Sequence, residues 1–312
     1  MSTPRHRPAV SIVTPCLNAA ATLPRLLTCI DSQTYQPIEH VVVDGMSTDR
    51  SERILKAANG RQRRIIRRKD RSMYEAINRG LAQTHGEIMA YLNSDDLYFP
   101  RTVETVVRYF ETHPEVDIVF GDCLSVNTDD DTFVLYLYAP REYELSRIGL
   151  DQAIGQPSVF WRRRVWEGLG PFDDSLRFVA DFEWWLRASR AGYCFAKLNR
   201  ILSIDCRAKG VLRNRHAEAL ATELAMVRGR YYQAIGWQRR FHERRNYWEG
   251  ILRKKLAEYR AGERFLPEPP GMIWFDQARY RAYHHQKPTH RLPILALNLP
   301  YFSFTGNRIE GL

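Results

Sequence analysis

The ten residues Glu87–Asp96 (EIMAYLNSDD) constrain the fold of this chain more than any other stretch. An apolar run of strand character stops at Asn93 and is followed at once by two adjacent carboxylates, Asp95 and Asp96. Two like charges at a strand end are costly unless a cation lies beside them. Open α/β sheets bind ligands at the carboxyl ends of their strands. The segment therefore favours a divalent cation that holds a phosphate, and a polar strand-to-helix turn is the alternative.

The first 125 residues alternate apolar runs of strand length with segments whose apolar residues recur at helical spacing. This alternation predicts a mostly parallel sheet with helices on both faces. Met73, Ile77 and Leu81 are expected on the buried face of one such helix. The predicted strands are 10–15, 39–45, 64–67, 87–92 and 116–121, and the predicted helices centre on 23–30, 54–58, 73–81 and 103–110.

The pattern changes after Thr132, where strands at 132–138, 157–161 and 194–204 and a helix at 181–191 indicate a mixed second half. We expect one domain over residues 1–212, with a nucleotide-binding half at about 8–125 and an acceptor half at about 126–212. Residues 213–312 form an extension that reads as helical and then, from Pro267, rich in proline and aromatic residues.

The net charge of +10 resides mainly in this extension, which carries 18 Lys and Arg against 9 Asp and Glu. Such a tail suits an anionic membrane surface, and a solvated helical face is the alternative. No nucleic-acid reader motif is present, so no nucleic-acid partner is expected. The candidate membrane-contact residues are Trp237, Phe241, Tyr247 and Trp248, which lie among Arg239, Arg240, Arg244 and Arg245.

Five widely spaced cysteines without a CxxC pair argue against a zinc site or a disulfide framework. The N-terminus lacks an apolar signal core, and no stretch approaches the roughly 20 apolar residues of a membrane-spanning helix. These features predict a cytoplasmic protein, with the basic tail as a candidate contact to the inner face of the membrane.

Four segments in order now suggest a family: SIVTPCLN at 11–18, EHVVVDGMSTD at 39–49, DRSMYEAINRG at 70–80 and GEIMAYLNSDD at 86–96. Together they resemble the family 2 glycosyltransferases of GT-A fold, of the bacterial cell-surface polysaccharide type. The resemblance runs from about Val10 to about Asp205. It implies a Rossmann-like α/β domain, followed here by the mainly helical basic extension.

The resemblance implies a donor that is a nucleoside diphosphate sugar, of UDP, GDP or dTDP type. Asp96 matches the family's metal ligand for Mg²⁺ or Mn²⁺, with Asp95 as its partner, and Asp44 matches the residue that contacts the nucleotide. The adjacent pair replaces the stricter Asp-any-Asp pattern, and Ser72 and Glu75 stand where Gly and Asp are usual. The other residues assigned to the nucleotide sugar are Thr14, Pro15, Asn18, Asp70, Arg71, Asn78 and Asn93.

The resemblance also assigns the catalytic base. The segment VADFEWWLR at 179–187 matches the family's Glu-Asp motif, in which the Asp deprotonates the acceptor hydroxyl, although Ala180 stands where Glu is frequent. We therefore expect Asp181 to be the base, with Glu183 as the competing carboxylate. His216 is a candidate for a late metal ligand. Residues assigned to the acceptor are Gln156, Trp161, Glu183 and Trp184, and both tryptophans have core packing as the alternative.

The expected reaction is an inverting sugar transfer to the hydroxyl of a glycan or lipid-linked glycan. A sugar nucleotidyltransferase of related fold is one alternative, but the stretch TPCLN after the first strand lacks the Gly-rich loop usual there. A non-catalytic basic protein on the same scaffold, binding membrane or nucleic acid, is another. A processive polymerase is not expected, because spanning segments and a Gln-x-x-Arg-Trp sequence are both missing.

Overall fold

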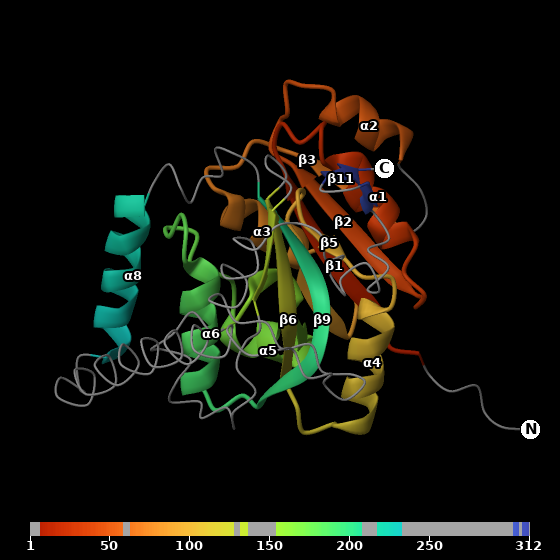
Figure 1. Cartoon of the computed structure of the whole chain (residues 1–312). Coiled ribbons are helices and arrows are strands. Elements are labelled where there is room, and N and C mark those ends of the chain that lie inside the picture. The colour runs from red at the N-terminus through yellow and green to blue at the C-terminus, as the bar shows by residue number, and fades with distance from the viewer. Residues whose placement is uncertain are drawn as a thin grey trace, which may run out of the picture.

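A computed structural model describes residues 7–58, 63–127, 132–136, 154–207, 217–232, 302–305 and 308–311. Its centre is a mixed sheet whose first half is parallel, in the order β3-β2-β1-β4 (Figure 1). These strands are β1 (Val10–Cys16), β2 (Ile38–Asp44), β3 (Arg63–Arg67) and β4 (Ile88–Tyr91). Their parallel register places all four carboxyl ends on one edge of the sheet.

The second half of the sheet is mixed. β8 (Val159–Arg162) is antiparallel to both β4 and β6 (Ile118–Asn127), and β9 (Phe195–Arg207) then runs parallel to β6. Two antiparallel strands complete it, β5 (Leu97–Tyr98) on β9 and β7 (Thr132–Tyr136) on β6. A separate hairpin pairs β10 (Phe302–Thr305) with β11 (Arg308–Gly311).

Helices cover both faces of the sheet because each buried strand sends alternate side chains to opposite sides. On β1, Val10 and Ile12 enter one core cluster and Val13 enters the other. The first cluster is covered by α1 (Leu23–Asp31), α2 (Ser51–Ala57) and α4 (Thr102–Thr112). The second is covered by α3 (Met73–Leu81), α5 (Arg163–Leu169), α6 (Ala180–Arg190) and α8 (Ala217–Tyr232).

The structure confirms each predicted strand and helix of the first 125 residues and the mixed character of the second half. Elements that the sequence did not indicate include the seven-residue helix α5 and the two-residue strand β5, both too short to show a period, and the β10–β11 hairpin. The expectation that Met73 is a core residue is wrong. Met73 is 40% exposed because it occupies the first position of α3, whose buried face begins at Tyr74.

Helix α3 packs closely on β1 because Gly80 faces that strand. A Cβ atom on Gly80 would lie 2.4 Å from Cγ1 of Val13 and 3.1 Å from Cγ2 of Val43. A glycine here therefore sets the distance between the helix and the sheet.

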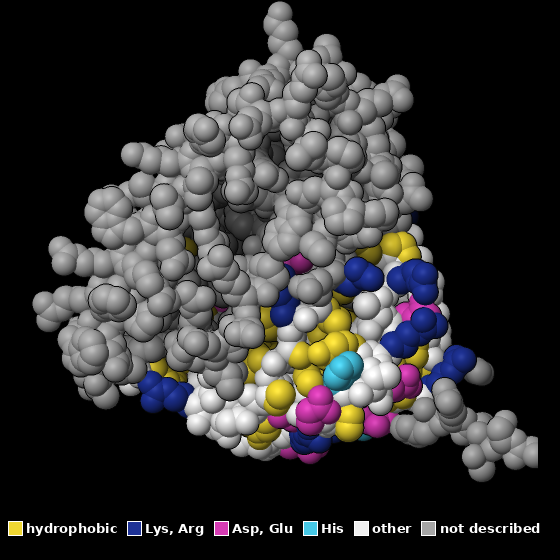
Figure 2. All heavy atoms as spheres, turned by 60° about the horizontal axis from the view of Figure 1, so that its bottom comes forward, with side chains coloured by type: hydrophobic (Ala, Val, Ile, Leu, Met, Phe, Trp, Pro, Cys, Tyr) yellow, Lys and Arg dark blue, Asp and Glu magenta, His cyan; other side chains and the backbone are white. Residues whose placement is uncertain are grey.

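Figure 2 brings the bottom of the Figure 1 view forward. On the described surface there, Lys and Arg side chains lie among Asp and Glu side chains, so the surface is mixed in charge.

No helix in the described part of the chain is both long and apolar enough to cross a bilayer. His216 and the candidate membrane-contact residues of the extension lie outside the described residues.

Candidate active site

Polar residues gather where the parallel strands end. Asp44 is the last residue of β2, Asp70 follows β3, and Asn93, Asp95 and Asp96 follow β4. Because these strands are parallel, their carboxyl ends share one edge of the sheet. The structure thus brings together residues that are as far apart in the sequence as Asp44 and Asp96.

Asp44 is fully buried and already bound within the protein. Its Oδ1 accepts hydrogen bonds from the backbone N–H of Ser47, at 3.0 Å, and from the Ser47 hydroxyl. Its Oδ2 accepts from Nε of Arg67 at 3.1 Å. Arg67 also pairs with Glu52 at 2.7 Å. Asp44 therefore fixes the loop between β2 and α2, and a donor would meet it beside Ser47 and Arg67.

The loops after β1 and β2 are tied to each other. The side-chain oxygen of Asn18 accepts from the backbone N–H of Thr48 at 2.8 Å, and the backbone N–H of Asn18 donates to Ser47 Oγ at 2.9 Å. Asn18 and Met46 both have positive φ, 52° and 68°. Non-glycine residues rarely adopt this conformation, and it often occurs at functional sites. Asn18 is exposed at this edge, whereas Pro15 is buried within β1.

Thr14 does not line the cleft with its side chain as expected. It is buried, and its hydroxyl lies 3.0 Å from Nε2 of His40. Nδ1 of the same imidazole accepts from Nε of Arg63 at 3.1 Å. The alternation of side chains along β1 puts Thr14 on the same face of the sheet as Val10 and Ile12, where it is buried against His40 of β2.

Asp95 and Asp96 lie close to a third carboxylate, Asp205 of β9. Burial raises the pKa of Asp96 well above its usual value, and the charges of Asp95 and Asp205 raise it further. Burial and Asp205 likewise raise the pKa of Asp95. The nearest donors to Asp96 are the backbone N–H of Cys206, at 3.3 Å, and Nδ2 of Asn93, at 3.2 Å. Like charges held this close to one another favour a cation.

The side chains at this point are of the type that binds magnesium or manganese, hard oxygen donors. Oδ1 of Asn93 is also buried and has no hydrogen-bond partner among the described residues. Within those same residues, no group of three or more His, Cys, Asp or Glu side chains is placed so that it could hold a metal ion. A cation held by Asp96 would therefore take most of its coordination from a bound ligand.

Asp70 and Arg79 form a second polar pair at the same edge. Nε and Nη2 of Arg79 both lie 2.8 Å from Oδ1 of Asp70, and the two side chains are largely buried. Oδ2 of Asp70 is buried without a hydrogen-bond partner in the described part of the chain. It therefore offers an acceptor to a ligand hydroxyl or N–H group.

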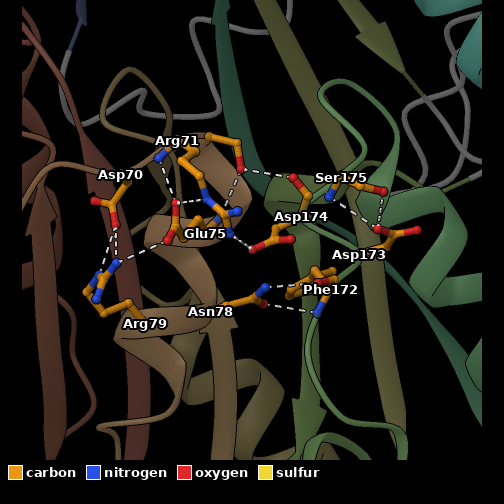
Figure 3. Close-up of polar contacts among 10 residues, drawn as sticks. Asp70, Arg71, Glu75, Asn78, Arg79, Phe172, Asp173, Asp174 and Ser175 are labelled. Carbon is orange, nitrogen blue, oxygen red and sulfur yellow. Dashed lines mark hydrogen bonds and ion pairs between the residues drawn. The ribbon is translucent and has the colours of Figure 1, made fainter.

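The start of α3 is bound to the turn that precedes α6 (Figure 3). Nδ2 of Asn78 donates to the carbonyl of Phe172, and Oδ1 of Asn78 accepts from its backbone N–H, both at 2.9 Å. Arg71 is 81% exposed and contacts Glu75 at 3.1 Å and Asp174 at 3.4 Å. Asn78 thus holds the protein backbone with both amide atoms, while Arg71 stays accessible to a ligand.

Asp181 lies in the first turn of α6, near Tyr91 at the end of β4. Burial and the nearby charge of Asp181 raise the pKa of Tyr74 well above its usual value, and the two side chains are hydrogen-bonded. Tyr91, the last residue of β4, bonds in turn to Tyr74, and burial together with the charges of Tyr74, Asp181 and Asp96 raises its pKa. The two buried tyrosines therefore connect the Asp181 carboxylate with the acidic end of β4.

The four residues assigned to the acceptor differ in their burial and contacts. Trp161 is 1% exposed and Trp184 is 0% exposed, and their ring centroids lie 5.4 Å apart in an aromatic core. A fully surrounded ring cannot offer its face to a sugar, so their assignment to the acceptor is wrong. Glu183 is buried against Arg187 at 3.0 Å and accepts from the Tyr231 hydroxyl. Gln156 is half-buried beside the site, donating to the carbonyl of Tyr91 at 2.9 Å.

Three residues of this site were missed from the sequence. Asp205 lies near the end of a long strand that gave no motif, and the pairing of β5 with β9, which sets Leu97 opposite Ile204, brings it beside Asp96. Tyr91 reads as part of the apolar run of its strand, whereas the sequence gave Tyr74 no assignment; both are buried. Only their contact with Asp181 reveals a polar role.

The fold is an α/β domain whose polar residues gather at the carboxyl ends of its parallel strands, with a further carboxylate, Asp181, at the start of α6. Residues 11–166 match the family model described as Glycosyl transferase family 2. A PGL/p-HBAD biosynthesis glycosyltransferase of Mycobacterium tuberculosis is 33% identical over 184 residues, which are 58% of this chain and 69% of that relative. The chain therefore belongs to glycosyl transferase family 2, and it is a glycosyl transfer enzyme.

Solved structures show the same fold. Staphylococcus aureus TarS 1–349 superposes with a TM-score of 0.56 at 19% identity, over 63% of this chain and 60% of that one. The mannosyltransferase PcManGT from Pyrobaculum calidifontis gives a TM-score of 0.55 at 19% identity, over 95% of this chain and 83% of that one. These likenesses confirm the predicted GT-A fold.

Proposed function

We propose that this protein transfers a sugar from a nucleoside diphosphate sugar to an acceptor hydroxyl, with inversion at the anomeric carbon. Asp181 acts as the base, and Asp96 holds a divalent metal ion. The observation that carries the proposal is the position of Tyr91, whose phenol is close enough to both Asp181 and Asp96 for each charge to raise its pKa. The carboxylate proposed as the base and the carboxylate proposed as the metal ligand therefore both lie near one buried phenol.

The donor is proposed to bind along the carboxyl edge of the parallel strands. Asp44 would lie beside its nucleoside, with the backbone from Pro15 to Asn18 on the same side of the cleft. Oδ2 of Asp70 and Oδ1 of Asn93 are buried oxygen atoms that lack partners among the described residues, so they are suited to donor hydroxyl or N–H groups. Arg71 is exposed and cationic, which suits a diphosphate.

Two structures of this fold support the donor class. TarS 1–349 was solved with UDP-GlcNAc and also with UDP, and PcManGT was solved with GDP-Man and Mn²⁺. The donor nucleotide of the present enzyme is therefore expected among the UDP, GDP and dTDP types.

Asp96 is the proposed protein ligand for Mg²⁺ or Mn²⁺, with Asp95 and Asp205 adding negative charge nearby. A bound cation would neutralise the diphosphate as it leaves the sugar. Asn93 holds Asp96 through Nδ2, and the backbone N–H of Cys206 holds its other oxygen. These two contacts fix the direction of the carboxylate before any ligand arrives.

Asp181 is proposed to accept the proton of the acceptor hydroxyl. The acceptor oxygen then forms a bond to the anomeric carbon while the bond from that carbon to the diphosphate oxygen breaks, which inverts the configuration. Tyr74 donates to Asp181 and thereby stabilises its charged form. Glu183 is a poorer candidate because Arg187 and Tyr231 already occupy its oxygens.

The acceptor is proposed to be a glycan or a lipid-linked glycan, bound over the half of the domain from about 126 to 212. The mycobacterial relative is named for PGL/p-HBAD biosynthesis. Contact of the basic extension with the inner face of the membrane remains part of this proposal.

The first experiment is a calorimetric titration of UDP, GDP and dTDP into the protein, with and without Mn²⁺. We expect one nucleotide to bind tightly only with Mn²⁺, and Asp96→Asn to abolish the effect of the metal. Hydrolysis of the matching nucleotide sugar, with release of the nucleoside diphosphate, then measures turnover without a known acceptor. Asp181→Asn should lower turnover by about a hundredfold or more with unchanged nucleotide binding.

The matched control is Glu218→Gln, an exposed acidic residue of α8 outside the site. Full turnover in Asp181→Asn would refute the base assignment. Metal-dependent binding that persists in Asp96→Asn would refute the metal assignment.

A further inference from the structure

Helix α8, the first described part of the basic extension, lies beside α6 (Figure 1). Its Glu223 bonds to the segment that leads into α6. Oε1 of Glu223 accepts from the backbone N–H of Arg177, and Oε2 accepts from the backbone N–H of Phe178, each at 2.8 Å. One carboxylate thus holds two consecutive backbone donors just before the helix that carries Asp181.

Two further contacts join α8 to the same region. Nη1 of Arg230 lies 3.1 Å from Oδ2 of Asp173, and the hydroxyl of Tyr231 donates to Glu183, two residues beyond Asp181. Apolar side chains of α8 complete the contact, since Val227 is fully buried and Leu220 and Leu224 pack on the same core cluster. α8 is therefore packed onto the domain as part of its core.

The opposite side of this segment is held by α3. Asn78 binds the backbone of Phe172 in both directions, and the hydroxyl of Ser72 donates to the carbonyl of Asp174 at 3.3 Å (Figure 3). Residues 172–178 therefore run between α3 and α8. Neighbours on both sides fix the backbone just before Asp181, so its position depends on two elements far apart in the sequence.

We propose that Glu223 is a positioning residue for Asp181 and that α8 belongs to the catalytic unit, although it follows the predicted domain boundary at 212. The inference rests on the proposed role of Asp181 as the base. A carboxylate that accepts from two backbone N–H groups near a helix start makes strong, charge-assisted bonds and fixes the direction in which the helix begins. Without them the Asp181 carboxylate would sample positions away from the acceptor hydroxyl.

The direct test of the geometry is amide hydrogen exchange. The backbone N–H groups of Arg177 and Phe178 should be protected in the wild type and should exchange about tenfold faster or more in Glu223→Ala. Glu218→Gln, on the same helix, should leave them unchanged. Equal exchange in the wild type and in Glu223→Ala would overturn the proposed contact without reference to activity.

The functional test compares Glu223→Gln and Glu223→Ala with the wild type in hydrolysis of the nucleotide sugar with Mn²⁺. Glutamine keeps one acceptor oxygen and loses the charge, so turnover should fall in the order Glu, Gln, Ala, by about tenfold or more for Ala. Nucleotide affinity measured by calorimetry should stay within about twofold, because Glu223 contacts Arg177 and Phe178, which are not among the residues proposed to bind the donor. A parallel loss of affinity and turnover would indicate general unfolding and refute the positioning role.

A double variant separates this inference from the proposed function. If Glu223 acts through Asp181, then Glu223→Ala should have little further effect in an Asp181→Asn background. A full additional loss there would overturn the inference while leaving the base intact. If Asp181→Asn alone retains full turnover, the base assignment fails and the inference falls with it.

Discussion

The buried imidazole of His40 gives a quantitative prediction about stability. His40 lies on β2 beneath the donor edge, between the Thr14 hydroxyl and Nε of Arg63. Burial lowers the pKa of His40 from 6.5 to about 3, and the nearby charge of Arg63 adds to the effect. The folded protein therefore keeps this side chain neutral at pH values where the unfolded chain protonates it.

The sign of the effect comes from proton linkage. Between the unfolded pKa of 6.5 and the folded pKa of about 3, the unfolded state binds more protons, so the free energy of unfolding falls as the pH falls. At about pH 5 the unfolded imidazole is almost fully protonated, and the loss relative to about pH 8 is about 2 kcal/mol. A folded pKa of about 4 would give nearly the same figure, because the folded state is still largely unprotonated at that pH.

The assay is urea unfolding at about pH 8, 6.5 and 5, for the wild type and for His40→Gln. Glutamine keeps a donor and an acceptor in the same place but does not titrate. Carboxylates also titrate in this range, and comparing the two proteins removes their contribution. The wild type should lose about 2 kcal/mol more than the variant between pH 8 and pH 5, a difference of about 4–8 °C in Tm. Equal pH dependence in the two proteins would refute the reasoning.

Two other substitutions test contacts around the site. Tyr74→Phe removes the hydroxyl that bonds to Asp181 and to Tyr91, so turnover should fall by about tenfold, because the Asp181 carboxylate loses a hydrogen-bond donor. Unchanged turnover would contradict this role. Gly80→Ala would place a Cβ 2.4 Å from Cγ1 of Val13, so the free energy of unfolding should fall by about 1–3 kcal/mol despite the better helix propensity of alanine. Thermal unfolding measures the change. An unchanged or higher Tm would show that β1 moves to make room for the added methyl group.

Different contacts hold the two parts of the proposed site in place. The donor edge is held by loops bonded to each other, as in the contacts of Asn18 with Ser47 and Thr48. The segment that leads into α6, the helix that carries Asp181, is held by α3 and α8. Changes in α8 are therefore expected to affect turnover more than nucleotide affinity.

The sequence alone determined the order of strands and helices and the edge at which the site lies. An apolar run followed by Asn93, Asp95 and Asp96 specifies a buried strand with a polar end, whatever the surrounding structure. The parallel alternation then places Asp44 and Asp70 at the same edge, since neighbouring parallel strands end together. Local pattern and chain order suffice for this much.

The tertiary structure alone decided what each side chain contacts. A period of two along a strand does not say which face carries the ligand, so Thr14 turned out to bind His40. An aromatic residue looks the same in sequence whether it lies in a core or at a sugar site, and Trp161 and Trp184 are in the core. Contacts between distant segments, such as Asp205 with Asp96 and Glu223 with Phe178, depend on long-range packing that no local pattern encodes.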